Sequence, residues 1–459
     1  MKIMLFGLLM MVGTNVNADD YEQDGIVYKL GVNNEAWVKG YTQVPEVVDI
    51  PETISPDSKN NYSVIGIETS AFYNCHNLTS IKIPESVRFI GDWAFKGCSN
   101  LVNVTLPKGL TDISTEAFMG CSNLASINIP SSVTSLGHSA FRGCESLTSI
   151  TIPYGIKEIA YATFEDCYSL TNVSIPNSVT SIGKYAFRGC RLVSITIPKS
   201  VTSIGEKAFT NHVLTSIIVE EGNPVFDSRE GCNAIIYTAD NTLLFGCRMT
   251  TIPNSVTVIG TEAFFACDEM TSFNIPGWVT SIGENAFARC SAMTSVTISE
   301  GVKVIGDGAF RECSSLMNVN IPNSVTDIGS FAFLACASMK NISIPNSVER
   351  IGGGAFRHSK KVENVYSFIV NPYDIDNVTF SDEAYTNATL YVPIGTKEIY
   401  RSKAGWQNFL NIQEFAPASI ESVHAGKPKS GIYYDTNGRQ LANPQKGVNI
   451  IGGRKVLVK

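Results

Sequence analysis

The sequence predicts a mostly β protein, a solenoid of about twelve stacked coils of 23 residues with small β caps at its ends. Three observations predict it: a Gly, an Ala-Phe pair and a Cys recur at fixed spacing, a short alternating apolar pattern precedes them, and a proline usually ends that pattern. Residues 86–98 ("SVRFIGDWAFKGC") and 178–190 ("SVTSIGKYAFRGC") show the repeat. A unit this short cannot bury its apolar side alone, so consecutive units must stack.

The period is measured from the phenylalanine of the Ala-Phe pair. Most steps are 23 residues, one is 22, and one is 55 because extra chain enters near residues 211–248. Within that insertion, "AIIYTADNTLLF" alternates on both sides of Asp240-Asn241 and predicts a β-hairpin. The twelve phenylalanines are at positions 72, 95, 118, 141, 164, 187, 209, 264, 287, 310, 333 and 356.

Each unit contains two short strands and a corner. In "LTSIKI", Ile81 and Ile83 face one side, as in a strand, and Pro84 ends the strand because proline cannot extend a central ladder. A second short strand ends at Gly91, which suits a positive φ or a close backbone approach. The following "AFKGC" predicts a one-turn 3₁₀ or helical corner that carries Phe95 inward.

The chain ends differ from the repeats and define five regions. Residues 1–18 have a Lys, a short apolar run and a small-residue end, which predicts a secretory signal peptide rather than the alternative, a buried N-terminal helix. We expect an N-terminal β cap at 19–64, the solenoid at 65–362, a closing segment at 363–417 and a C-terminal β tail at 418–459. The apolar run within residues 1–18 is too short to span a bilayer, and no other stretch of the sequence is long enough to do so.

Ten of the twelve cysteines occupy one repeat position. We expect them to be small buried apolar residues, although a partial disulfide ladder remains open. A zinc site is disfavoured because the chain has no C-x-x-C pair. Cys232 and Cys247 lie in the insertion instead, where the hairpin would bring them opposite each other, so a disulfide between them is possible.

Catalytic, cofactor and metal sites are not predicted. The five histidines are unpaired in the sequence, and no nucleophile elbow or phosphate loop is present. We expect the carboxylates of Glu165, Asp166, Asp307 and Glu312 to be solvated at variable corners, so an enzyme is not expected. With 35 basic and 42 acidic residues, the chain also lacks the basic character of a nucleic-acid-binding protein.

Two surfaces are candidates for binding. The outward strand positions form a nearly uncharged Ser/Thr/Asn face, whereas the edge beside each Ala-Phe pair carries aromatic and basic residues, the types that dominate protein-binding hot spots. We therefore expect a partner at this edge and keep open that its arginines only solubilise it. The candidate residues are Trp93, Lys96, Arg142, Tyr161, Tyr185, Arg188, Arg311 and Arg357.

The repeat, with its I-P, S-V-T-S-I-G, A-F and C elements, closely resembles the BspA-like leucine-rich repeat family of bacterial surface proteins, of the Bacteroidetes type. "LYVPIGTKEIYRSKAGWQNFLNIQEF" from Leu390 to Phe415 resembles the segment that closes such solenoids. The tail, with "YDTNGR" and a terminal "KVLVK", resembles secretion sorting domains.

The resemblance implies an extracellular or outer-surface binding protein. It implies adhesion to host extracellular-matrix proteins such as fibronectin or fibrinogen, or to other cells. A glycan-binding surface module and a structural spacer without a specific ligand are the alternatives.

Overall fold

The computed structural model describes residues 20–43, 45–57, 59–210 and 213–415, together with the backbone of four short strands near the C-terminus. The segment predicted as a signal peptide, residues 1–18, lies outside the described residues, as does most of the predicted tail. The four strands of the tail are antiparallel, in the order β35-β34-β36-β37. They are β34 (Tyr433–Tyr434), β35 (Gln440–Leu441), β36 (Gly447–Ile451) and β37 (Arg454–Val458).

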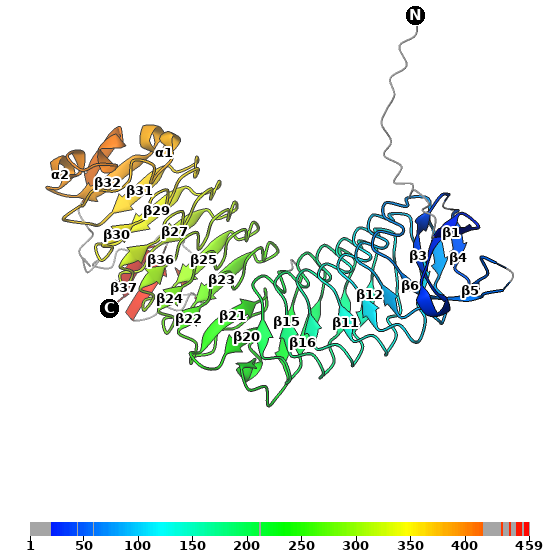
Figure 1. Cartoon of the computed structure of the whole chain (residues 1–459). Coiled ribbons are helices and arrows are strands. Elements are labelled where there is room, and N and C mark those ends of the chain that lie inside the picture. The colour runs from blue at the N-terminus through cyan, green and yellow to red at the C-terminus, as the bar shows by residue number, and fades with distance from the viewer. Residues whose placement is uncertain are drawn as a thin grey trace, which may run out of the picture.

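The described chain winds into a β-solenoid with two ladders of parallel strands. Most coils add one strand to each ladder (Figure 1). The first ladder contains β4 (Val47–Asp49), β7 (Ser80–Lys82), β9 (Asn103–Thr105), β12 (Ser149–Thr151), β14 (Asn172–Ser174), β16 (Ser194–Ile197), β18 (Ser216–Val219), β23 (Ser272–Ile275), β25 (Ser295–Ile298), β27 (Asn318–Asn320), β29 (Asn341–Ile344), β31 (Asn364–Ser367), β32 (Thr389–Pro393) and β33 (Asn411–Phe415). The second contains β6 (Tyr62–Ile67), β8 (Phe89–Ile90), β10 (Asp112–Ile113), β11 (Ser135–Leu136), β13 (Glu158–Ile159), β15 (Ser181–Ile182), β17 (Ser203–Ile204), β21 (Thr242–Gly246), β22 (Val258–Ile259), β24 (Ser281–Ile282), β26 (Val304–Ile305), β28 (Asp327–Ile328) and β30 (Arg350–Ile351).

The solenoid has about 15 turns, more than the twelve that the repeat predicts. The difference arises because both ends continue the ladders without the repeat motif: β4 pairs with β7, while β32 and β33 extend the ladder beyond β31. The N-terminal end also has β1 (Asp20–Gln23), β2 (Ile26–Leu30), η1 (Val32–Asn34), β3 (Glu35–Tyr41) and β5 (Thr53–Ile54). The C-terminal end has α1 (Asp382–Asn387), α2 (Lys397–Arg401) and η3 (Trp406–Asn408).

The core is a column of phenylalanine rings, one from each repeat. From Phe72 to Phe209 neighbouring ring centroids are 5.1–5.7 Å apart, and from Phe264 to Phe380 they are 4.8–5.4 Å apart. The rings are nearly parallel because identical positions of parallel coils are neighbours. Tyr41 continues the column at the N-terminal end. The prediction that the Ala-Phe pair is buried is therefore confirmed.

The corner around each Ala-Phe pair is compact but is not a continuous 3₁₀ helix. Ala94 N–H donates to Gly91 O in its own coil, whereas Phe95 N–H donates to Ala117 O of the next coil. This alternation places the residue two before each phenylalanine, such as Trp93 with φ 59°, in the left-handed region. Gly91 itself serves the other predicted purpose, a close approach, because a Cβ there would lie 2.8 Å from Thr69 N.

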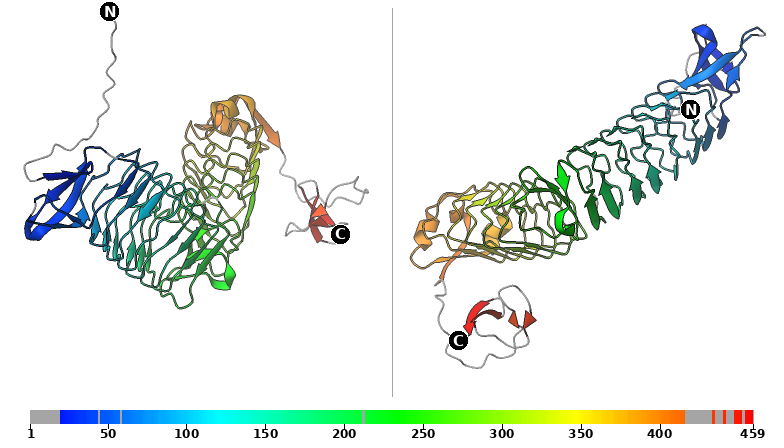
Figure 2. Two further views of the ribbon diagram at one scale, coloured as in Figure 1. Left: turned by 90° about the vertical axis from the view of Figure 1, so that its right-hand side faces the viewer. Right: turned by 90° about the horizontal axis from the view of Figure 1, so that it is seen from below.

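The insertion interrupts the column and divides the core into two clusters. It forms the predicted hairpin from β20 (Ala234–Tyr237) and β21, preceded by β19 (Phe226–Asp227) and η2 (Arg229–Gly231). Phe209 meets Phe245 edge-on at 5.8 Å, so the first column ends there and a new one begins at Phe264. The solenoid bends at this insertion, and its two arms are seen from two further directions in Figure 2.

Candidate functional site

The predicted binding edge follows the corners of the coils. Each ladder phenylalanine points inward, and in most coils the residue two before it and the residue directly after it are at least partly exposed; Ser139, Ala162 and Glu165 are among the buried exceptions. We call this surface the corner edge. Trp93, Tyr185 and Phe331 occupy the first of these positions, and Arg142 and Arg188 the second. Trp93 is 42% exposed and Tyr161 is 43% exposed, so these rings are accessible to a partner.

The structure brings only part of the predicted set together. Tyr161 and Tyr185 contact each other edge-to-face, with centroids 5.7 Å apart, and the guanidinium of Arg188 lies 5.2 Å from the Tyr185 ring centroid. Trp93 and Lys96 lie several coils toward the N-terminus, where Lys96 Nζ pairs with Glu116 at 2.5 Å. The exposed Arg357 lies on the last repeat, separated from the cluster by several coils.

Arg142 and Arg188 are joined by a buried carboxylate. Glu165 occupies the equivalent position in the coil between them, and its oxygens lie 2.9 Å from Arg142 Nε and 3.0 Å from Arg188 Nη1. The Glu165 side chain is only 3% exposed. The expectation that Glu165 is solvated is therefore wrong, because two flanking arginines compensate the charge that burial would otherwise penalise.

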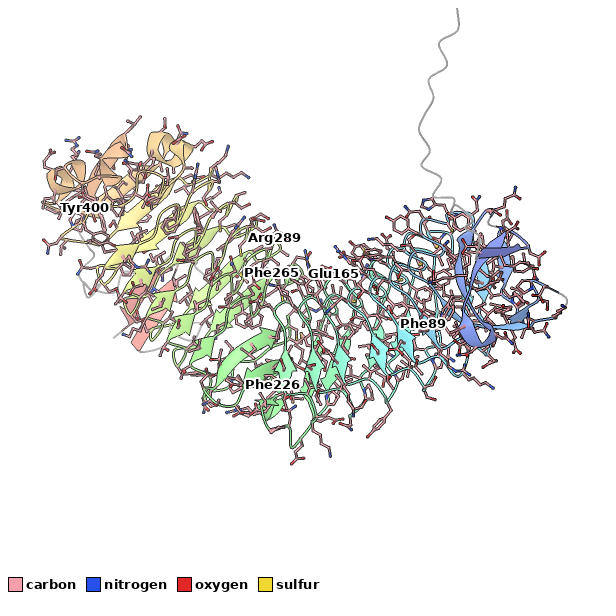
Figure 3. All side chains as sticks on the ribbon, viewed as in Figure 1. Phe89, Glu165, Phe226, Phe265, Arg289 and Tyr400 are labelled. Atoms are coloured by element: carbon pink, nitrogen blue, oxygen red, sulfur yellow. The ribbon has the colours of Figure 1, made fainter. Side chains whose placement is uncertain are left out.

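A hollow of about 300 Å³ opens on the corner edge where the two arms meet. Figure 3 shows Glu165, Phe265 and Arg289 on the inner side of the bend, with Phe226 on the outer side. The hollow exists because the insertion removes the regular stacking between the coils of Phe209 and Phe264. We call it the bend notch; its lining residues are Tyr185, Arg188, Lys207, Glu262, Phe265, Asn285, Ala288, Arg289 and Arg311.

The bend notch combines basic groups with an aromatic ring. Lys207 Nζ lies 4.8 Å and the Arg289 guanidinium 5.8 Å from the centroid of Phe265. Lys207 also bridges the two arms by pairing with Glu262 at 2.7 Å. Glu312 lies at the rim, where it binds Nε of both Arg289 and Arg311, at 3.0 and 2.9 Å.

This arrangement leaves a surplus of positive charge inside the notch. Four of its lining residues are basic, whereas three carboxylates pair with them: Glu262 within the lining, and Glu165 and Glu312 beside it. Glu312 engages the Nε atoms of Arg289 and Arg311, and each guanidinium carries further N–H donors on its Nη atoms. Guanidinium groups donate paired hydrogen bonds to carboxylates, so the notch suits an acidic group next to an apolar one.

Three of the predicted residues, Tyr185, Arg188 and Arg311, line the notch. The sequence did not identify Lys207, Glu262 and Arg289 as site residues, because they become neighbours only when the insertion folds and interrupts the regular stacking of the coils. A usable signal existed for Lys207 and Glu262, which hold corner-edge positions in the two coils on either side of the 55-residue step, but not for Arg289, which lies two residues after Phe287.

The cysteine ladder is buried, and all twelve thiols are free. Eight of the ten ladder thiols also have a polar role, because the S–H group donates to the carbonyl of the phenylalanine in the preceding coil, as from Cys98 to Phe72 at 3.0 Å. Ser359 replaces the cysteine in the last repeat and makes the same bond, at 3.2 Å to Phe333 O. Burial raises the pKa of the Cys267 and Cys313 thiols to about 12, so these thiols are unreactive.

The possible disulfide between Cys232 and Cys247 is not present in the structure. The hairpin pairs Ala234 with Gly246, so Cys247 lies beside Asn233 rather than Cys232. The two thiols consequently pack on opposite sides of the insertion, Cys247 in the N-terminal core cluster and Cys232 in the C-terminal one.

Within the described part of the chain, no group of three or more His, Cys, Asp and Glu side chains is placed to hold a metal ion. None of the helices in that part is long and apolar enough to cross a membrane.

Comparison with known proteins places this geometry in a family. The model of the BspA type leucine rich repeat region matches residues 65–182, 157–230 and 244–363. A leucine rich cell surface protein from Faecalibacterium prausnitzii is 32% identical with a TM-score of 0.65, covering 76% of this chain and 94% of that one. The pneumococcal vaccine antigen PcpA shares the fold at 19% identity and a TM-score of 0.60, covering 86% of this chain and 98% of its own. A comparison with curated protein sequences finds no match. The chain therefore belongs to the BspA-type leucine-rich repeat family.

Proposed function

We propose that this chain is a secreted or cell-surface adhesin without enzymatic activity. It attaches its cell to a host extracellular-matrix protein of the fibronectin or fibrinogen class, or to another cell. The family membership supports a binding scaffold, since repeat solenoids present extended surfaces to partners. The Faecalibacterium relative, which is described as a cell surface protein, supports surface display.

The proposed regions of the chain have separate purposes. Residues 1–18 direct export and are removed, and the tail at 418–459 directs delivery to the surface. The regions at 19–64 and 363–417 cover the two ends of the solenoid at 65–362, which carries the partner-binding surface.

The observation that carries the proposal is the bend notch. An extended acidic segment can lie along the corner edge, with one carboxylate against Arg188 or Arg289 and an apolar side chain against Phe265. Hydrogen bonds to charged groups contribute about 1.5–3 kcal/mol each, so two or three of them supply about 3–9 kcal/mol, and the apolar contact with Phe265 must add to them to reach the roughly 8 kcal/mol of micromolar affinity. The neighbouring Tyr161–Tyr185 pair would extend the contact along the edge.

The test is binding of the full chain to immobilised fibronectin and fibrinogen. The double variant Arg188→Ser/Arg289→Ser removes two notch cations, yet Glu165 keeps Arg142 and Glu312 keeps Arg311 as partners. We expect about a tenfold or greater loss of affinity, a steep decrease in parent binding with added salt, and a melting temperature lowered by about 2–4 °C at most.

Lys96→Ser/Arg357→Ser is the matched control, because it removes two corner-edge cations far from the notch. It should bind as the parent does. Equal binding by the notch variant and the parent, or equal losses in both double variants, would exclude the notch as the site.

A further inference from the structure

A second polar surface lies at the C-terminal end of the first ladder, far along the arm from the bend (Figure 1). Strands β27, β29, β31, β32 and β33 pair in parallel there, so equivalent outward side chains form straight rows across five strands. At about 4.8 Å per strand the rows are about 19 Å long. The first row is Asn318, Asn341, Asn364, Thr389 and Asn411, and the second is Asn320, Ser343, Tyr366, Tyr391 and Gln413.

The first row is a chain of hydrogen-bonded amides. Asn341 Nδ2 donates to Asn318 Oδ1 at 2.7 Å, and Asn364 Nδ2 donates to Asn341 Oδ1 at 2.8 Å. Asn411 Nδ2 donates to the Thr389 hydroxyl at 2.6 Å. Each amide in such a chain retains a second N–H and a second lone pair, so the row offers a donor and an acceptor at every strand.

The second row contains an aromatic step. The rings of Tyr366 and Tyr391 stack with centroids 4.8 Å apart and an interplanar angle of 10°. On the side opposite Tyr391, Tyr366 pairs in register with Ser343. Because the serine side chain is small, it leaves space beside the face of the Tyr366 ring that is turned away from Tyr391. The Phe415 ring is nearly perpendicular to those of Tyr366 and Phe368, with centroids 6.3 and 5.2 Å away, so the step belongs to a larger aromatic cluster.

The two rows carry no charged residue, and the charges next to them are compensated. Lys340 and Glu363, just before β29 and β31, pair with each other at 3.3 Å. Glu414 on β33 accepts hydrogen bonds from the backbone N–H groups of Gly395 and Lys397. The rows offer no opposite charge to a charged ligand, whereas a neutral ligand needs none.

From these observations we propose that the two rows bind a neutral polysaccharide. Sugar hydroxyls donate and accept hydrogen bonds, as the amides do, and the C–H face of a sugar ring can pack on the free face of Tyr366. The regular spacing of the rows suits a ligand that is itself a repeating chain. This site is independent of the bend notch and would give the protein a second class of ligand.

The experiment is affinity electrophoresis of the full chain in native gels that contain galactomannan, xyloglucan or mixed-linkage β-glucan, with polygalacturonate as an anionic comparison. We expect retardation in at least one neutral gel. Tyr366→Ala/Tyr391→Ala should weaken binding about tenfold or more, and Tyr366→Phe/Tyr391→Phe should retain it within about threefold because the stacking face remains. The Phe variant also guards against a loss caused by unfolding.

The matched control is Thr151→Ala/Ser174→Ala, which changes the equivalent outward positions of β12 and β14, a separate sheet in the N-terminal arm where the paired residues are not aromatic. It should migrate as the parent does. Absence of retardation in all neutral gels, retardation in polygalacturonate only, or unchanged binding by the Tyr→Ala variant would overturn the proposal. So would a parent dimer that dissociates when Tyr366 and Tyr391 are replaced, because a second copy of the chain would then occupy the face.

Discussion

We expect Arg142 and Arg188 to be energetically coupled through Glu165, which lies between them. In Arg142→Ser or Arg188→Ser, the carboxylate keeps one guanidinium, at 3.0 or 2.9 Å respectively. In the double variant it has neither, and its side chain, 3% exposed, cannot be reached by bulk water without local opening of the coils.

The expected magnitudes follow from this exposure. The arginine side chains are 39% and 45% exposed, so each single replacement should lower the free energy of unfolding by only about 1 kcal/mol or less. Removing both partners leaves a buried unpaired charge, for which about 3–5 kcal/mol is typical. The double variant should thus exceed the sum of the singles by about 1–3 kcal/mol. Adding Glu165→Gln should recover much of the loss, since the neutral amide needs no counter-charge.

Urea denaturation of the parent, both single variants, the double variant and the triple variant would measure this coupling. Because a long repeat array need not unfold in one step, hydrogen exchange at the coils of Phe141, Phe164 and Phe187 should accompany the equilibrium curves. The double variant should lose protection in these coils first. Losses that add within about 0.5 kcal/mol, or a triple variant no more stable than the double, would refute the assignment of Glu165 as a buried bridging charge.

Three further predictions concern the core. Phe141→Ala should lower stability by about 3–5 kcal/mol, since its ring is fully buried between neighbours at 5.5 and 5.7 Å; a thermal melt showing a loss below about 1 kcal/mol would contradict its place in the column. Alkylation of the denatured, unreduced protein should label all twelve cysteines, and mass spectrometry that finds a blocked pair would reveal a disulfide that the structure lacks. Stability should fall as pH rises above about 9, because unfolded thiols lose their protons there while folded thiols such as Cys313, with a pKa of about 12, hold them; denaturation curves between pH 8 and 11 should show a smaller fall for Cys313→Ala.

Much of the fold follows from local sequence because each coil contacts only its neighbours. The spacing of Gly91, Phe95 and Cys98, repeated coil after coil, is enough to predict the solenoid and the inward rings, and the alternating pattern of residues 234–245 predicts the hairpin of the insertion. The sequence does not decide whether Gly91 is required for a positive φ or for a close backbone approach, because the answer depends on where the backbone of the adjacent coil lies. The extra turns at the ends could not be predicted from the repeat motif either, since ladder hydrogen bonds require no particular side chain.

By itself, the sequence determined the repeat, the resemblance to the family and the inward position of the ladder phenylalanines, because these depend on the period of one chain segment. Tertiary structure alone decided which corner-edge residues meet and which are buried. Glu165 is buried because two coils place arginines on either side of it. The bend notch exists because a segment without the repeat separates Phe209 from Phe264, which turns the two arms toward each other and brings Lys207 to Glu262. Likewise, Tyr366 and Tyr391 form a step only because the closing strands continue the ladder in register, a property of the stacked chain rather than of either segment.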